Sequence, residues 1–113
     1  MMKNEVMIVW STDNRETAEN MVLLYALNAK LKGWFDEVTL LIWGASQKLL
    51  VEDTYFQTKI KEISDAGVRV VACKKCSESL GIKGSLEACS VELFYTGVLL
   101  SDWAKSGKPL LTF

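Results

Sequence analysis

Residues 38–43, Val-Thr-Leu-Leu-Ile-Trp, form an apolar run of strand length in which polar and apolar side chains do not alternate. This pattern is typical of a strand that is buried on both faces, as in a parallel sheet covered by helices on both sides. Residues 5–10 and 68–72 have the same character. The three runs predict a parallel sheet at the centre of the molecule.

The segments between these runs carry helix signals. Asp13 and Glu16 have the spacing of a capping box and precede an apolar-rich segment, so we predict a helix over residues 17–31 that stops at Gly33. A second helix is predicted to begin at residue 53 or 54 and to stop at a glycine. The remaining predicted elements are a short helix, a strand, a helix and a terminal strand, at residues 77–80, 89–93, 95–105 and 110–113.

Strands and helices therefore alternate along the whole chain. Alternation with buried strands predicts the α/β class: a three-layer α/β/α sandwich around a mostly parallel, five-stranded open sheet of the flavodoxin-like type. The 113 residues are enough for one domain, which we expect to span residues 1–113, because single domains commonly have about 100–150 residues.

The composition excludes several classes of function. Thirteen Lys and Arg balance fourteen Asp and Glu, so the chain has no overall positive field for nucleic acid or an anionic membrane. The apolar runs are far shorter than the ~20 residues that a bilayer span needs, and we expect a cytoplasmic protein. Histidine is absent, which removes serine–histidine and cysteine–histidine pairs. Any chemistry must come from cysteine, carboxylate, lysine or backbone groups.

In open α/β sheets the ligand crevice lies beyond the carboxyl ends of the strands. Three such ends are predicted here, and they begin at Trp10, Trp43 and Cys73. We expect the following residues to shape a substrate crevice: Ser11, Thr12, Trp43, Gly44, Ala45, Ser46 and Lys74.

Cys73 is the candidate nucleophile at this edge. It is predicted to leave the third strand where the next helix begins, and thiols at helix N-termini have pKa values of roughly 3.5–7.5 instead of ~8.5. Lys74 and Lys75 would favour the thiolate further. Free cysteine is also among the most buried residue types, so Cys73 could equally extend the core. Cys76 is either a redox partner of Cys73 or a packing residue, and Cys89 is expected to be a core thiol.

The chain lacks the full ligand set of a zinc site and the motifs of common phosphate sites. A closed zinc site needs four ligands, whereas the chain offers three cysteines and no histidine, so a carboxylate or a second subunit would have to contribute. Neither glycine-rich phosphate motif occurs, although an FMN phosphate could rest on Ser11 and Thr12. We expect no metal and no organic cofactor.

The chain resembles the DsrE/DsrF-like (TusD-type) sulfur-transfer superfamily over nearly its whole length. The similar segments are Leu-Ile-Trp-Gly-Ala-Ser-Gln-Lys-Leu-Leu at 41–50, Gly-Val-Arg-Val-Val-Ala-Cys at 67–73, Leu-Gly-Ile at 80–82, Tyr-Thr-Gly-Val-Leu-Leu at 95–100 and Leu-Leu-Thr-Phe at 110–113. The resemblance implies a three-layer α/β/α fold and assembly into homo- or hetero-oligomers. In the sulfur-relay members a cysteine eight residues before a glycine carries a persulfide, and Cys73 precedes Gly81 by eight.

This resemblance implies a sulfur carrier or sulfurtransferase-like protein that holds sulfur on Cys73 and passes it to an acceptor thiol, with a sulfur donor or acceptor protein as partner. The apolar residues at 95–103 also predict a homo-oligomer, whether dimer, trimer or hexamer. Two alternatives remain open. Cys76 could resolve a persulfide on Cys73 into a disulfide, which gives a thiol–disulfide protein. The chain could instead be a non-catalytic oligomeric binding module.

Overall fold

The computed structural model describes residues 4–75, 78 and 91–113. Its centre is a five-stranded sheet with the strand order β4-β3-β2-β1-β5, and every neighbouring pair is parallel. The strands are β1 (Glu5–Trp10), β2 (Glu37–Ile42), β3 (Arg69–Cys73), β4 (Glu92–Phe94) and β5 (Leu110–Thr112). The predicted fold class is confirmed.

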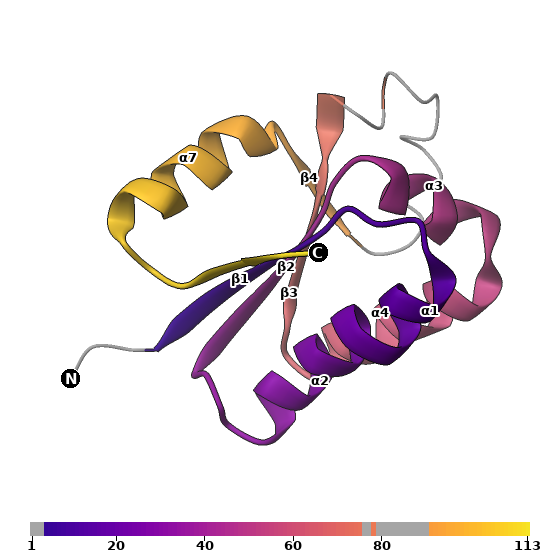
Figure 1. The fold of residues 1–113 in the computed structure, drawn as a ribbon, viewed down its shortest axis with the longest axis horizontal. Coiled ribbons are helices and arrows are strands. Elements are labelled where there is room, and N and C mark those ends of the chain that lie inside the picture. Colours follow the sequence, from indigo (N-terminus) through magenta and orange to yellow (C-terminus); the bar gives the residue numbers. More distant parts are fainter. Residues whose placement is uncertain (1–3, 76–77, 79–90) are drawn as a thin grey trace.

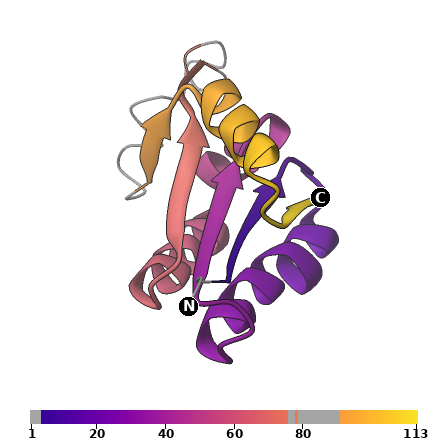
Figure 2. The ribbon, with the colours of Figure 1, turned by 90° about the vertical axis from the view of Figure 1, so that its left-hand side faces the viewer.

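Helices cover both faces of this sheet. Figure 1 shows α7 alone on one side, whereas the other described helices lie on the opposite side. In Figure 2 α7 crosses in front of the strands, with β4 at one edge and β5 at the other. The helical segments are α1 (Arg15–Thr17), the π-helix η1 (Ala18–Leu23), α2 (Leu24–Leu31), α3 (Ala45–Glu52), α4 (Thr54–Asp65) and α7 (Thr96–Ser106).

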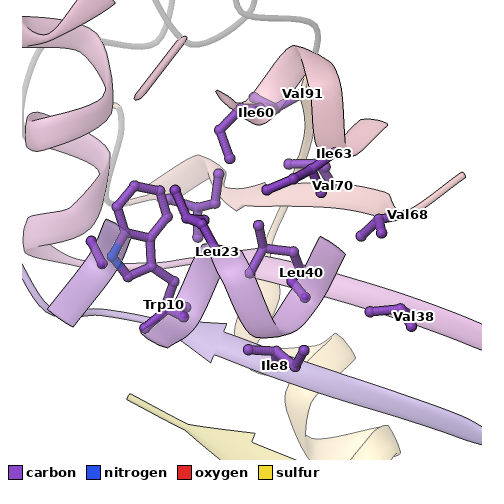
Figure 3. Packing of buried hydrophobic residues seen from close by; sticks show 14 of the residues in the cluster. Ile8, Trp10, Leu23, Val38, Leu40, Ile60, Ile63, Val68, Val70 and Val91 are labelled. Atoms are coloured by element: carbon purple, nitrogen blue, oxygen red, sulfur yellow. The ribbon is translucent and has the colours of Figure 1, made fainter. Parts of the chain in front are cut away.

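The main hydrophobic core lies between the sheet and the helices on the side of α2 and α4 (Figure 3). Strand residues such as Ile8, Leu40 and Val70 pack there with Leu23 and Ile60 of the helices. Each such side chain, once removed from water, stabilises the fold by about 1.5–3 kcal/mol. The opposite face has a smaller buried cluster, against which residues of α7 pack; its members are Met7, Val9, Leu41 and Val71.

The first helix begins differently from the prediction. The N-cap is Asn14, whose side chain accepts a hydrogen bond from the Thr17 N–H at 2.9 Å, and Asp13 lies outside the helix. Asn is as good a cap as Asp, so the choice between adjacent residues depends on the path of the chain out of β1. The helix then widens to π geometry over Ala18–Leu23, with both Val22 and Leu23 buried.

Helix α3 was not predicted. It starts directly after Gly44 and ends at Asp53, and Asp53 also caps α4 by accepting a hydrogen bond from the Tyr55 N–H. Because one residue ends one helix and begins the next, no loop separates them. The second predicted helix is confirmed as α4, with Phe56, Ile60 and Ile63 buried on one face.

The other predicted elements are confirmed with small shifts at their ends. The strand expected at 89–93 is β4, three residues long, and the last helix runs to Ser106 and closes at Gly107 with φ 77°. Of the short helix expected at 77–80, the structure describes Glu78, whose backbone is helical, and the other three residues lie outside the described part of the chain. No helix in the described part of the chain is long and apolar enough to cross a bilayer.

Candidate functional site

The carboxyl ends of β1, β2 and β3 meet at one edge of the sheet. Trp10 is paired with Ile42, and Ile42 is paired with Ala72, so the residues that follow each strand end lie next to one another. The Trp43 N–H donates a hydrogen bond to the Trp10 carbonyl at 3.1 Å across this edge. The structure therefore brings together the three strand ends that were expected to form the crevice.

Ser11 and Thr12 bind the chain's own backbone. The N–H groups of both residues donate to the Phe113 carbonyl, at 2.7 and 3.2 Å, and the Ser11 hydroxyl donates to the same oxygen at 3.0 Å. The Thr12 hydroxyl accepts from the Asn14 N–H at 3.1 Å. These donors fasten β5 to the end of β1, and the expected role of both residues in substrate binding stays a prediction.

The second strand end turns sharply into α3. Gly44 has φ 71° and ψ −137°, a combination that is essentially restricted to glycine. Ser46 is completely buried, and its hydroxyl lies within hydrogen-bond distance of the Trp10 carbonyl and, at 3.0 Å, of the Trp43 carbonyl. Trp43 is half-buried beside the smaller core cluster, and Ala45 is exposed. Ser46 thus connects the start of α3 to the strand ends by hydrogen bonding.

Gln47 is a site residue that the sequence analysis missed. Its side chain is fully buried, and its Nε2 donates to the carbonyls of Ile42 and Cys73, both at 3.0 Å. Its Oε1 has no hydrogen-bond partner among the described residues. The one available signal was the helical spacing of Gln47 and Leu50, which would have placed Gln47 on a buried stripe had α3 been recognised.

Cys73 is the last residue of β3 and is 3% exposed. The next two residues, Lys74 and Lys75, already have helical backbone, as predicted. The Lys74 ammonium lies 5.2 Å from the centroid of the Tyr95 ring. Burial fits the core-thiol alternative and the strand-to-helix position fits the nucleophile alternative, so both stay predictions. Cys76 and Cys89 lie outside the described residues.

An exposed apolar surface adjoins Cys73. Phe94 is paired with Cys73 across the β3–β4 ladder, and with Tyr95 and Val98 it forms what we call the β4–α7 patch. These three side chains are 41%, 57% and 67% exposed. The Arg69 guanidinium lies 5.4 Å from the centroid of the Phe94 ring. The patch therefore begins on the strand next to the one that carries the thiol.

The described residues hold no group of three Cys, Asp or Glu side chains that could bind a metal ion. A hollow of about 230 Å³ lies beside the start of α3, and its lining includes Asp13, Ala45 and Lys48. The edge is thus built mainly from backbone groups, hydroxyls, one amide and one thiol.

The sequence matches no protein-family model and none of the curated proteins. Among solved structures, it is similar to the conserved protein of unknown function BT1422 from Bacteroides thetaiotaomicron, with 35% identity and a TM-score of 0.94. The similarity covers 97% of this chain and 95% of that one. This chain belongs to the BT1422 family.

Two more distant structures share the fold of the BT1422 family. The protein of unknown function MTH1491 from Methanobacterium thermoautotrophicum is 18% identical with a TM-score of 0.72, and the match covers 97% of this chain and 99% of that one. The YchN protein of E. coli is 20% identical with a TM-score of 0.68, and coverage is 99% and 100%. These two similarities show that the chain has a DsrE/YchN-type fold.

Proposed function

We propose that this protein is a small cytoplasmic sulfur carrier or sulfurtransferase-like protein that holds sulfur as a persulfide on Cys73. The observation that carries the proposal is the position of Cys73, at the carboxyl end of an inner strand where helical backbone begins, in a chain with a DsrE/YchN-type fold. Backbone N–H groups at such a position, and the adjacent lysines, stabilise a thiolate.

The chemistry requires no cofactor. The Cys73 thiolate attacks the outer sulfur of a donor persulfide, a new sulfur–sulfur bond forms on Cys73, and the donor leaves as a thiolate as its own sulfur–sulfur bond breaks. An acceptor thiolate then takes the same sulfur from Cys73 and leaves the Cys73 thiolate behind. Neither step needs an oxidant or a reductant, because the sulfane sulfur passes from one thiolate to another and one sulfur–sulfur bond forms as another breaks.

The surroundings of Cys73 support storage of a labile sulfur. Burial keeps water from the thiol, because Cys73 is almost completely covered by the rest of the chain. Entry of a donor then requires movement around the strand end, which makes access to Cys73 the property to measure first.

We further propose that the protein assembles as a homo-oligomer and meets its sulfur donor or acceptor protein through the β4–α7 patch. Exposed apolar side chains that gather at one place mark interaction surfaces. The patch includes the residue paired with Cys73, so a partner seated there contacts the strand next to the one that carries the thiol. Light scattering of the Tyr95→Lys variant tests the assembly; an unchanged mass at equal concentration would contradict the role of the patch.

The decisive experiment locates sulfur on individual cysteines. Incubation with a low-molecular-weight persulfide, followed by trypsin and mass spectrometry, separates the three thiols, because the cleavage sites place them in peptides 70–74, 76–83 and 84–105. We expect one added sulfur on peptide 70–74. The Cys73→Ser variant should lose the adduct, and the matched Cys89→Ser variant should keep it.

Two other results would overturn the proposal. A Cys73 that takes no sulfur from the donor would leave the binding-module alternative. A cross-link between peptides 70–74 and 76–83, formed with the loss of two hydrogens and reversed by a reducing thiol, would instead establish the thiol–disulfide alternative.

A further inference from the structure

The Gln47 side chain joins the ends of two strands. Its amide nitrogen has two protons, and the two carbonyl oxygens at 3.0 Å, one on Ile42 and one on Cys73, accept both of them. The orientation of the amide is therefore fixed. Exchange of its nitrogen and oxygen would set Oε1 against two carbonyl oxygens, which repel it.

This bridge acts on the peptide unit that follows the thiol. The Cys73 carbonyl and the Lys74 N–H belong to one planar group and point in opposite directions. A carbonyl that is held towards Gln47 thus fixes the direction of the Lys74 N–H. That N–H is the first amide of the helical backbone after Cys73, and amides at such positions stabilise a thiolate.

The two side chains approach the strand end from opposite layers. Gln47 comes from α3, which lies across the sheet from α7 (Figure 1). Cys73 follows Val71 by two residues in the strand, so its side chain is on the face that α7 covers. Gln47 therefore acts on the backbone of Cys73 and not on its side chain.

The buried Oε1 atom provides an independent reason to look for a role. It has no partner in the described chain, and an apolar side chain of the same size would avoid an unmatched acceptor in the core. The amide nevertheless satisfies two strand-end carbonyls that an apolar side chain would leave without this donor, and one of them belongs to the peptide of the candidate nucleophile.

We propose that Gln47 is a positioning residue for Cys73, which it orients through the Cys73–Lys74 peptide group so that the Lys74 N–H favours the thiolate. The biological purpose of this positioning rests on the proposed persulfide function. Its measurable effect is on the fraction of Cys73 that is thiolate at a given pH. Gln47 touches no substrate in this arrangement.

The test is the pH profile of alkylation at Cys73, followed on peptide 70–74 with iodoacetamide. The Gln47→Met variant keeps the length of the side chain and removes both donors. We expect the midpoint of its profile to move to higher pH and the rate at pH 7 to fall about tenfold, because only the thiolate reacts. The plateau at high pH should stay within about twofold of wild type, because access is unchanged.

The chain offers a matched control. Gln57 of α4 also donates from its side-chain amide to a backbone carbonyl, that of Val51 in α3, at 3.1 Å. The Gln57→Met variant should leave the profile of Cys73 unchanged. A Gln47→Met protein with the wild-type midpoint, or with a lowered plateau and no shift in midpoint, would overturn the proposal.

A measurement on the wild-type protein covers the case in which Gln47→Met does not fold. The amide proton signal of Lys74 should shift with pH at the same midpoint as the alkylation of Cys73, and the Gly97 amide in α7 should not. A Lys74 signal that ignores the titration of the thiol would also overturn the proposal. Sulfur loading is measured in a separate experiment. A wild-type Cys73 that takes no sulfur would reject the proposed persulfide function and leave the positioning role of Gln47 intact.

Discussion

Replacement of Gly44 by alanine tests the turn that connects the second strand to the site. At φ 71° and ψ −137°, an alanine is strained whatever space surrounds it, and a Cβ built at this position meets no atom within 4 Å. Any loss of stability in Gly44→Ala therefore comes from the backbone and not from a clash. Because α3 starts at this turn, the same strain acts on the helix that carries Gln47.

The size of the effect follows from two opposing contributions. Strain at such a sparsely populated backbone conformation lowers the free energy of unfolding by about 1–3 kcal/mol. The smaller conformational freedom of alanine in the unfolded chain raises it by about 0.4–1 kcal/mol. The net expectation is a free energy of unfolding that is lower by about 1–2 kcal/mol. For a chain of 113 residues, 1 kcal/mol corresponds to about 4 °C, so the melting temperature should fall by about 4–8 °C.

Gly97→Ala is the matched control. Gly97 lies in α7 with no positive φ, and its added Cβ also meets nothing within 4 Å. Alanine should stabilise this helical position by about 0.5 kcal/mol. Urea unfolding followed by tryptophan fluorescence measures both variants. A Gly44→Ala protein at least as stable as wild type would refute the assigned turn.

Three further predictions concern single hydrogen bonds. Ser46→Ala should lower the free energy of unfolding by about 0.5–1.5 kcal/mol, measured in urea, because the hydrogen bond of a buried hydroxyl to the strand-end carbonyls is lost while the Trp10 carbonyl keeps the Trp43 N–H as a donor. Asp53→Ala should lower the free energy of unfolding by about 1 kcal/mol, because the helix cap is lost, whereas Asp53→Asn should retain most of the capping stabilisation. Equal decreases in the two variants would contradict the role of Asp53 as a cap. The hydrogen bond from the Tyr55 hydroxyl to Glu19 raises the pKa of Tyr55 above 10.0, so the bond stabilises the fold below pH 10 and that stability is lost as the pH rises through the raised pKa. Tyr55→Phe should remove this alkaline loss of stability from the urea midpoint measured against pH.

Much of the fold could be predicted because each buried strand has a recognisable local sequence pattern. The apolar run at 38–43 has no alternation, and a strand buried on both faces needs none. Helix α4 was equally accessible, since its cap and its buried stripe lie within one segment. Helix α3 was missed because Asp53 ends it and caps its successor, which leaves no glycine, proline or polar loop to mark a boundary.

The candidate site was predictable only to the level of its strand ends. Parallel strands place their carboxyl ends at one edge, and this rule alone brought Ser11, Gly44 and Cys73 near one another. The hydrogen bonds that organise the edge join residues far apart in sequence. Gln47 and Cys73 are 26 residues apart, and Ser11 and Phe113 are 102 apart. No local sequence pattern encodes such pairs. The Gln47 bridge and the hydrogen bond of the Ser11 hydroxyl could therefore be recognised only in the three-dimensional structure.

The two layers of helices differ in a way that bears on the thiol. The large core packs against the layer that contains α3 and α4, and the Gln47 amide reaches the strand ends from that firmly packed side. Cys73 lies on the other face, where the buried cluster is small and α7 is the one described helix. The firmly packed side can therefore fix the backbone of the thiol, and under the proposed carrier function the lightly covered side is the expected route of a donor. A carrier needs both conditions, because a sulfur atom must be held in one orientation and still be handed on.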